Sequence, residues 1–168
     1  MTAKKYPMIS IIVAIDNSNA IGRGGDLLYH LRGDMRHFKE LTTGHTVVMG
    51  RRTFESLPKG ALPDRRNIVI TRQPCYSAPG IELASSLEEA LSMSASDHVY
   101  IIGGGEVYKQ TIGIADCLEL TRIDAVTPDA DTFFPAIDPS QWHTTSESAP
   151  LSDEKTGLRY RFLTLTRL

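Results

Sequence analysis

The order of apolar and polar positions divides the chain into short apolar runs and segments with helical spacing. Apolar runs of strand length, rich in β-branched residues, lie at residues 8–15, 45–50, 67–71, 99–102 and 117–123. Helical spacing occurs between them, in a segment that ends near Leu41 and at residues 51–57, 86–93 and 103–110. Strands that alternate with helices across short connections are typical of a parallel sheet with helices on both faces.

The last third of the chain has a different pattern. Residues 124–138 are rich in Asp and Pro and predict a loop, whereas apolar and basic residues alternate over residues 158–163. No helical segment separates residues 142–148 from residues 158–165, so these two runs are predicted to pair as antiparallel strands. Since no repeat or linker interrupts the chain, we expect one α/β domain over residues 1–168. Its central mixed β-sheet is mostly parallel, antiparallel at the C-terminal end, and has helices on both faces.

The composition indicates a folded globular protein and limits the kinds of partner it binds. The 168 residues include 41% apolar and 23% charged side chains and carry a formal net charge of −2. These values exclude a disordered chain and argue against general binding to nucleic acid or to an anionic membrane. No apolar run approaches membrane-spanning length. The basic and apolar start of the chain runs into Asp16 without a small-residue cleavage site, and Cys75 and Cys117 can form one bridge at most, so we expect a cytoplasmic protein.

A glycine-rich stretch precedes the first helix, and the helix carries an acid on its apolar side. The glycines within residues 22–25 predict an irregular loop. The apolar stripe of the helix is formed by Leu31, Met35, Phe38 and Leu41. Asp34 falls on that stripe, where a carboxylate needs hydrogen bonds, a proton or a ligand that supplies donors. The alternative is that Asp34 only occupies the first helical turn, where free N–H groups favour acids.

Two strand-to-helix connections turn on glycine and suggest anion binding. Gly50 precedes Arg51 and Arg52, and the triple glycine 103–105 opens a later helix. Helix starts offer free N–H groups, and both connections lie at the carboxyl ends of strands, where open α/β sheets bind ligands. Two anion sites at one edge suit a dinucleotide, and Arg72 adds a cation that favours NADP over NAD. The alternatives are a tight turn without a ligand and a solvated arginine pair.

Other familiar motifs are absent from the sequence. Residues 103–108 read GGGEVY, so Tyr108 stands where a third glycine would complete the Rossmann fingerprint. Neither GxxxxGK[ST] nor GxSxG occurs. The histidines show no ligand spacing with cysteines or carboxylates, so no metal site is predicted.

Taken together, these stretches resemble dihydrofolate reductase of the chromosomal bacterial type, from residue 8 nearly to the C-terminus. The resemblance is carried by MISIIVAI, AIGRGGDLLYHL, DMRHFK, VVMGRRTFESLPKGALPDRRNIV, IIGGGEVY, Thr121 in LTRID, and DTFFP. In this family NADPH passes a hydride to C6 of the pterin ring of 7,8-dihydrofolate, and N5 is protonated. The resemblance implies tetrahydrofolate as product, a role in one-carbon metabolism, antifolate inhibitors as ligands and a monomeric protein.

The resemblance also implies the site residues. Asp34 would accept hydrogen bonds from pterin N3–H and the 2-amino group and favour N5 protonation indirectly, Thr121 would bond to Asp34, and Arg65 would hold the glutamate α-carboxylate. The implied substrate contacts are Ile12, Val13, Leu27, Asp34, Phe38, Leu62, Arg65 and Thr121. The implied cofactor contacts are Ala14, Ile21, Gly22, Gly50, Arg51, Arg52, Thr53, Thr71, Arg72, Ile102, Gly103, Gly104, Gly105, Glu106, Val107 and Tyr108. The resemblance further implies a cis peptide between Gly103 and Gly104.

The glycine-rich loop resembles the mobile lid of this family, with three departures. Leu28 stands where proline is usual, Leu27 where many bacterial members have methionine, and Tyr29 where a tryptophan helps to order the active-site water. A phenol can also hydrogen-bond a water, so Tyr29 is a second catalytic candidate.

Two alternatives are weighed beside this interpretation. A pyrimidine reductase of riboflavin synthesis shares the architecture, but the pair Asp34 and Phe38 and the presence of Arg65 argue against it. A non-catalytic NADP-binding module would keep only the cofactor site.

Overall fold

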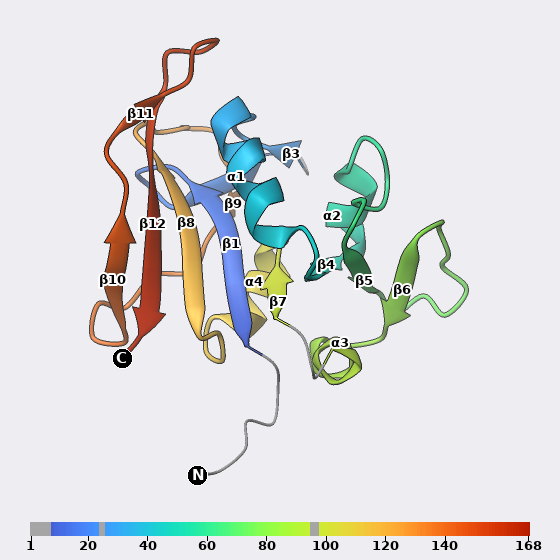
Figure 1. Cartoon of the computed structure of the whole chain (residues 1–168). Coiled ribbons are helices and arrows are strands. Elements are labelled where there is room, and N and C mark those ends of the chain that lie inside the picture. The colour runs from blue at the N-terminus through green and yellow to red at the C-terminus, as the bar shows by residue number, and fades with distance from the viewer. Residues whose placement is uncertain (1–7, 24–25, 95–97) are drawn as a thin grey trace.

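The computed structural model describes residues 8–23, 26–94 and 98–168, and a large mixed sheet forms its centre (Figure 1). The strands of this sheet are β1 (Ile9–Ile15), β4 (Thr46–Gly50), β5 (Arg66–Ile70), β6 (Ile81–Ala84), β7 (Val99–Ile101), β8 (Cys117–Ile123), β10 (Trp142–Glu147), β11 (Leu151–Ser152) and β12 (Arg159–Arg167). Their order is β10-β12-β8-β1-β7-β4-β5-β6, with β11 paired to β12. The pairings from β8 to β6 are parallel, and β12 joins β8 and β10 in antiparallel fashion. The predicted fold class is therefore confirmed.

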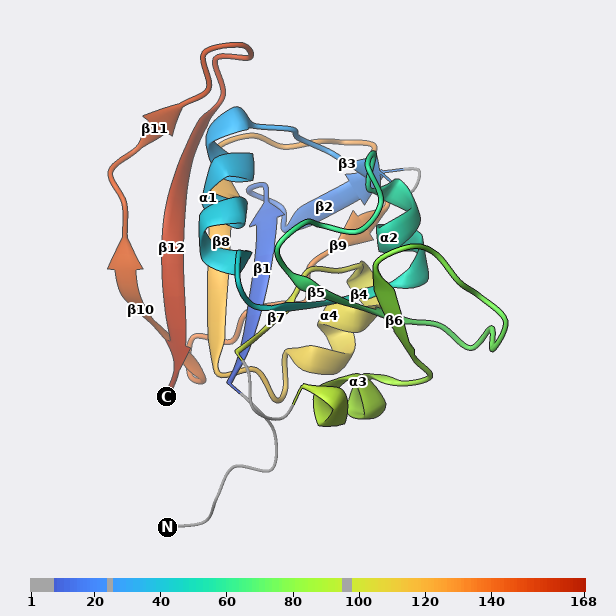
Figure 2. The same ribbon diagram turned by 45° about the vertical axis from the view of Figure 1, so that its right-hand side comes forward.

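Helices cover both faces of the sheet, as Figure 2 shows. They are α1 (Arg32–Thr42), α2 (Arg51–Ser56), α3 (Leu87–Met93) and α4 (Gly105–Thr111). Phe38 of α1 and Phe54 of α2 pack with Ile12 in one apolar cluster, whereas α3 and α4 pack with Ile11 and Val13 in the other. Because successive side chains of β1 enter opposite clusters, its apolar run is buried on both faces.

A second, small sheet overturns one prediction. It has the order β3 (Asp26–Leu27), β2 (Ala20–Arg23) and β9 (Thr132–Phe133), so the prediction of an irregular loop was wrong for β2, and β9 lies in a segment predicted as loop. Ala20 pairs with Phe133, and the N–H of Asp131 donates to the carbonyl of Gly22 at 3.0 Å. β2 and β9 are distant in sequence and are held by their pairing with each other. Neither therefore shows the alternation of apolar and polar residues that predicts a strand. Gly24 and Gly25, predicted in the same loop, lie outside the described residues.

The predicted apolar stripe of α1 was wrong at one position. Leu31 is 1% exposed and Phe38 and Leu41 are partly buried, but Met35 is 60% exposed. Successive helical residues are rotated by about 100°. Since the side that packs on the sheet passes through Asp34 and Phe38, Met35 turns away from it.

In the part of the chain that is described, no helix combines the length and the apolar character needed to cross a membrane.

Candidate functional site

Asp34 lies where α1 faces the centre of the sheet. It occupies the first turn of α1, and its carboxylate Oδ1 accepts a hydrogen bond of 2.5 Å from the hydroxyl of Thr121 in β8. This is the bond expected from the sequence. The N-cap residue Leu31 makes no side-chain cap bond. Asp34 therefore combines the two positions considered for it, the first helical turn and the sheet-facing side of the helix.

The surroundings of Asp34 favour a protonated or ligand-bound carboxyl. Burial raises the pKa of Asp34, while the bond from Thr121 and the charge of nearby His37 act in the opposite direction. Among the described residues, the second oxygen, Oδ2, has no hydrogen-bond partner. A ligand with N–H donors would provide the missing hydrogen bond to Oδ2.

An apolar wall lies on the same face of the sheet. Ile12, Phe38, Leu62 and Ile102 belong to one cluster, so the structure brings these predicted contacts together. Val13 does not join them, because strand alternation turns its side chain into the cluster on the opposite face. Leu27 is in β3, and its side chain lies outside the described residues.

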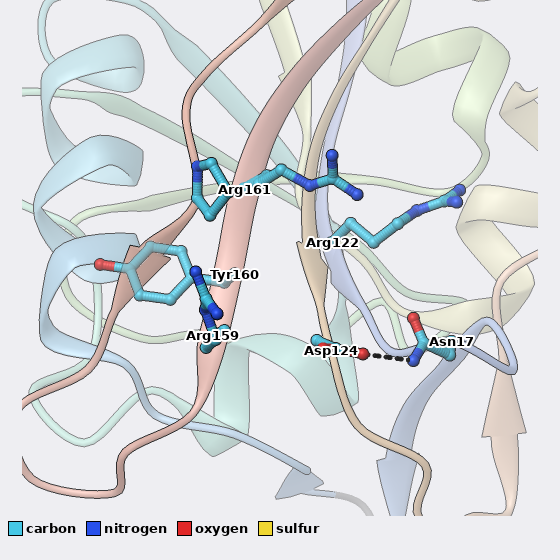
Figure 3. A pocket seen from close by; sticks show the side chains of 7 residues that line it. Asn17, Arg122, Asp124, Arg159, Tyr160 and Arg161 are labelled. Atoms are coloured by element: carbon cyan, nitrogen blue, oxygen red, sulfur yellow. Dashed lines mark hydrogen bonds between the residues drawn. The ribbon is translucent and has the colours of Figure 1, made fainter.

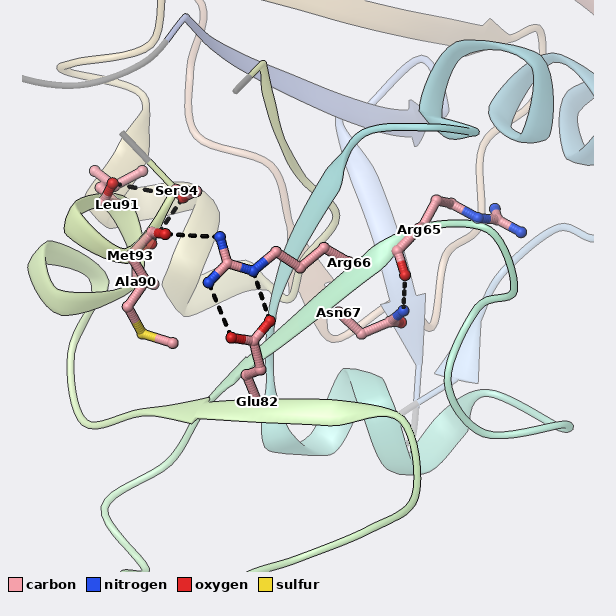
Figure 4. Close-up of polar contacts among 8 residues, drawn as sticks. All are labelled: Arg65, Arg66, Asn67, Glu82, Ala90, Leu91, Met93 and Ser94. Carbon is pink, nitrogen blue, oxygen red and sulfur yellow. Dashed lines mark hydrogen bonds and ion pairs between the residues drawn. The ribbon is translucent and has the colours of Figure 1, made fainter. Parts of the chain in front are cut away.

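Arg65 directly precedes β5, and its side chain points away from Arg66 and Glu82 (Figure 4). Its Nε donates to the carbonyl of Pro63 at 2.8 Å and one terminal nitrogen donates to the hydroxyl of Thr42 at 3.2 Å. Burial lowers the pKa of Arg65, opposed by the charge of Asp64. The guanidinium is thus held in place by few bonds and keeps donors for a carboxylate.

Asn67 shapes the loop that carries Leu62 and Arg65. It is 2% exposed, and its side-chain amide donates to the carbonyls of Leu62 and Arg65 at 2.9 and 3.0 Å, while its oxygen accepts from the N–H of Leu62 at 2.9 Å. Sequence reasoning missed this residue. The available signal was a single amide at the start of the apolar run NIVIT.

The glycine turn after β7 packs closely against Thr53 and Thr132. The Gly103–Gly104 peptide is cis, as expected, and Gly103 has a φ of +126° that favours glycine. A Cβ added at Gly104 would lie 3.3 Å from the hydroxyl oxygen of Thr53, and one at Gly105 would lie 2.8 Å from a methyl group of Thr132. The N–H of Gly50 donates to the carbonyl of Gly103 at 2.9 Å, so the two glycine turns lie side by side.

Three cations follow the adjacent strands β4 and β5. Gly50 and Ile70 are partners in the parallel register, so Arg51 and the pair Thr71 and Arg72 leave the sheet at one edge. Arg51 forms an ion pair of 2.6 Å with Glu55 and lies 6.0 Å from the ring centre of Tyr76. Within the described ranges, Arg52 and Arg72 are exposed and form no ion pair. Arg52 and Arg72 are therefore more available than Arg51 to bind a phosphate.

The remaining predicted cofactor contacts differ in their exposure. Ala14 pairs with Thr121, and Glu106 is exposed in the first turn of α4. Ile21 and Val107 are buried in the core cluster on the α3 and α4 face, so mainly their backbones are left for a ligand. Gly22 lies in β2.

Tyr108 is buried between α4 and β1. Its hydroxyl donates to the carbonyl of Ile12 at 2.9 Å, its ring lies edge-on to Phe134, and burial raises its pKa, with the charge of Asp34 adding to the shift. Tyr108 therefore links α4 to β1, the strand that borders the apolar wall.

Tyr29 uses its hydroxyl differently from the expectation. The hydroxyl bonds to that of Thr127 at 2.5 Å, and the backbone N–H of Thr127 donates to Asp16 at 3.0 Å. Asp16 is 1% exposed and also accepts from Ser18 and Ala20, so it joins the start of the small sheet to the loop after β8. Sequence reasoning missed Asp16, an acid directly after an apolar strand.

The described residues contain no group of three or more His, Cys, Asp or Glu side chains that would hold a metal ion.

Fold and site together define an α/β protein that binds its ligands at one edge of the sheet. One sheet edge combines a partly buried carboxylate and an apolar wall with glycine turns flanked by arginines, which suits a small heterocyclic substrate and a dinucleotide.

Comparison with known proteins gives the family. The family model described as dihydrofolate reductase matches residues 8–167. The chain is 42% identical over 161 residues to dihydrofolate reductase type 3 of Salmonella typhimurium, covering 95% of this chain and 98% of that protein. It is 42% identical over 164 residues to the dihydrofolate reductase of Mycobacterium tuberculosis (strain CDC 1551 / Oshkosh), again covering 95% and 98%. The solved structure of dihydrofolate reductase from Enterococcus faecalis, complexed with NADP(H) and RAB-propyl, matches with a TM-score of 0.87 at 37% identity, covering 96% of this chain and 98% of that one.

The chain belongs to the dihydrofolate reductase family, and the resemblance noted in the sequence is confirmed. The comparisons give no support to the riboflavin-pathway alternative.

Proposed function

We propose that this protein reduces 7,8-dihydrofolate to 5,6,7,8-tetrahydrofolate with NADPH. The observation that carries the proposal is the carboxylate of Asp34, which lies on the sheet-facing side of α1 with Oδ1 bonded to Thr121 and with Oδ2 lacking a partner among the described residues. A pterin presents two adjacent donors, N3–H and the 2-amino group. These donors match a carboxylate and remove the penalty of burying it.

In this mechanism the protein's own residues bind and orient the substrate. Asp34 holds the donor edge of the pterin, and Thr121 fixes the carboxylate through Oδ1. The wall of Ile12, Phe38 and Leu62 excludes water from the ring, and Arg65 binds the α-carboxylate of the glutamate tail. Asp34 contacts the donor edge of the ring and not N5, so it favours the proton at N5 indirectly, through the pterin tautomer and a nearby water.

The residues at the glycine edge fit NADPH. Glycine at positions 104 and 105 lets the turn pack against Thr53 and Thr132, and the backbone N–H groups at the start of α4 would bind the pyrophosphate. Arg52 and Arg72 supply charge for the 2′-phosphate. When bound, the cofactor supplies the hydride that goes to C6. Thr53 and Thr71 lie at the adenosine end, and Ala14, Ile21 and Ile102 at the nicotinamide end.

We also propose that the enzyme works as a monomer in the cytoplasm and that antifolates compete with dihydrofolate at Asp34. Both cysteines are free, Cys75 exposed and Cys117 buried, which fits a reducing compartment.

The test is the variant Asp34→Asn beside Glu40→Gln, an exposed acid on the same helix. We expect Asp34→Asn to fold and bind NADPH but to lose most turnover at neutral pH, measured as loss of NADPH absorbance with dihydrofolate. Glu40→Gln should keep parental turnover. Near-normal turnover of Asp34→Asn would remove the acid from the mechanism, and no dihydrofolate-dependent NADPH loss by the parent would refute the function.

A further inference from the structure

Three arginines gather on the C-terminal strands, away from Asp34. Arg122 of β8 and Arg159 and Arg161 of β12 line a hollow of about 300 Å³ (Figure 3). Its other walls are formed by Asn17, Asp124, Pro150 and Tyr160. The hollow is not part of the site described above.

The sheet itself separates the hollow from the substrate face. Thr121 bonds to Asp34, and its cross-strand partner Phe162 stacks on His37 of α1 with ring centres 3.9 Å apart. Strand alternation turns their neighbours Arg122 and Arg161 to the opposite face. In Figure 3 these two guanidiniums extend to the same side, while Tyr160 points the other way, toward α1.

The positive charges of the hollow are incompletely balanced. Arg122 and Arg161 are direct partners across β8 and β12, and like charges in that position repel. Arg161 has an ion pair of 3.2 Å with Glu147, but in the described ranges Arg122 and Arg159 have none. Asp124 accepts a bond of 2.9 Å from Asn17 and forms no ion pair with them.

Other arginines of the protein differ in their pairing. Arg23, Arg51 and Arg66 each form an ion pair of 2.5 to 2.7 Å with an acid of their own, whereas Arg52 and Arg72 of the proposed cofactor site form none among the described residues. The protein as a whole carries a formal net charge of −2. Outside the proposed cofactor site, the hollow thus gathers three arginines of which only Arg161 has an ion pair, and an external anion would reduce their repulsion.

We propose that this hollow binds a phosphate-type oxyanion carrying two or more charges, either free or as part of a metabolite. Guanidinium groups bind such oxygens through paired N–H donors, and groups on two strands contact different oxygens of one ligand. Multiple charge is required because a single pair of charges in contact with water is worth only about 1 kcal/mol.

The test uses inorganic pyrophosphate and protein saturated with NADP⁺, so that the cofactor phosphates already fill their own site. Calorimetry at low salt should show one saturable site per chain, weakened by added salt. The double variant Arg122→Gln/Arg161→Gln should weaken binding by about tenfold or more. The control Lys155→Gln removes one nearby exposed charge that does not line the hollow, and it should change binding by about twofold or less.

Thermal unfolding provides a second readout. Pyrophosphate should raise the Tm of the parent and of Lys155→Gln but not that of the double variant, because only a ligand of the folded state stabilises it. Dihydrofolate turnover should stay at the parental level in all three proteins, so this test is independent of the proposed enzymatic function. No saturable binding by the parent, or equal binding by the double variant, would overturn the proposal.

Discussion

Gly33 lies between Asp34 and the buried Tyr160, and adding one methyl group there should disturb both. A Cβ at Gly33 would lie 2.1 Å from the hydroxyl oxygen of Tyr160 and 3.2 Å from the ring carbon that carries it. Tyr160 is 6% exposed and its ring packs edge-on against Phe162, so it has little freedom to move aside. We expect the first turn of α1 to shift instead.

The magnitude of the effect follows from two opposing contributions. Alanine in place of glycine stabilises a helix by about 1 kcal/mol. Overpacking a buried contact costs about 1–3 kcal/mol, and a 2.1 Å approach belongs at the upper end. Gly33→Ala should therefore lower the free energy of unfolding by about 1–2 kcal/mol. Turnover should fall by about 10- to 100-fold, since Asp34 is the next residue and its position would change.

A double-mutant cycle tests this explanation. Tyr160→Phe removes the atom at 2.1 Å, so Gly33→Ala should be tolerated better on that background, with a coupling of about 1 kcal/mol or more. Urea unfolding and NADPH-coupled turnover are measured for the parent, both single variants and the double variant. If Gly33→Ala has the same effect on both backgrounds, or none on either, the contact with Tyr160 does not set the position of α1.

Three further predictions concern the acids and the lid tyrosine. Asp16→Ala should destabilise the protein by about 3 kcal/mol in urea unfolding, because buried N–H groups lose their acceptor. Burial tends to raise the pKa of Asp16, but its hydrogen bonds, led by that from the Ser18 hydroxyl, outweigh burial and lower it. The stability from this group is thus present above the unfolded pKa of 3.8 and lost as pH falls through the lowered value, and an Asp16→Ala protein as acid-sensitive as the parent would contradict this. The pKa of Asp34 is shifted in the opposite direction, so Asp34→Asn should be more stable than the parent at neutral pH. This difference in the free energy of unfolding should shrink as pH falls through the raised pKa. A difference that does not depend on pH would count against burial as the cause. Tyr29→Phe and Thr127→Val should alter turnover equally if the bond between these two hydroxyls positions the segment after β3. A changed pH profile in Tyr29→Phe alone would instead indicate the water-ordering role.

Much of the fold was readable from the sequence because the central strands are covered on both faces. Burial on both faces leaves continuous apolar runs such as MISIIVAI, and each of the five central runs is a strand whose ends differ from the prediction by one residue or less. The antiparallel pairing of β10 with β12 was readable from the missing helix between them. These signals are local, so they need no knowledge of the partner strand.

The features that could not be predicted depend on distant contacts. β2 takes its hydrogen bonds from the segment around Phe133, and Asp16 bonds to Thr127, so neither leaves a periodic pattern. Asn67 donates hydrogen bonds to the backbone of the preceding loop, and the spacing of apolar residues carries no information on such bonds. For Met35 the pattern was present but misleading, because an acid rather than an apolar residue lies on the line that faces the sheet.

Asp16 and Asp34 differ in the features that separate a structural acid from the proposed functional one. Both are withdrawn from water, yet Asp16 accepts bonds from four protein donors, on Ser18, Ala20 and Thr127, while Asp34 accepts one, from Thr121. The pKa of Asp16 is lowered because protein donors satisfy its charge, and the pKa of Asp34 is raised because they do not. The unmet hydrogen-bonding capacity of Asp34 is a destabilising feature of the free protein, and a pterin's donors would convert it into binding energy. The direction of the pKa shift, combined with the number of donors, therefore separates the two roles where burial alone does not.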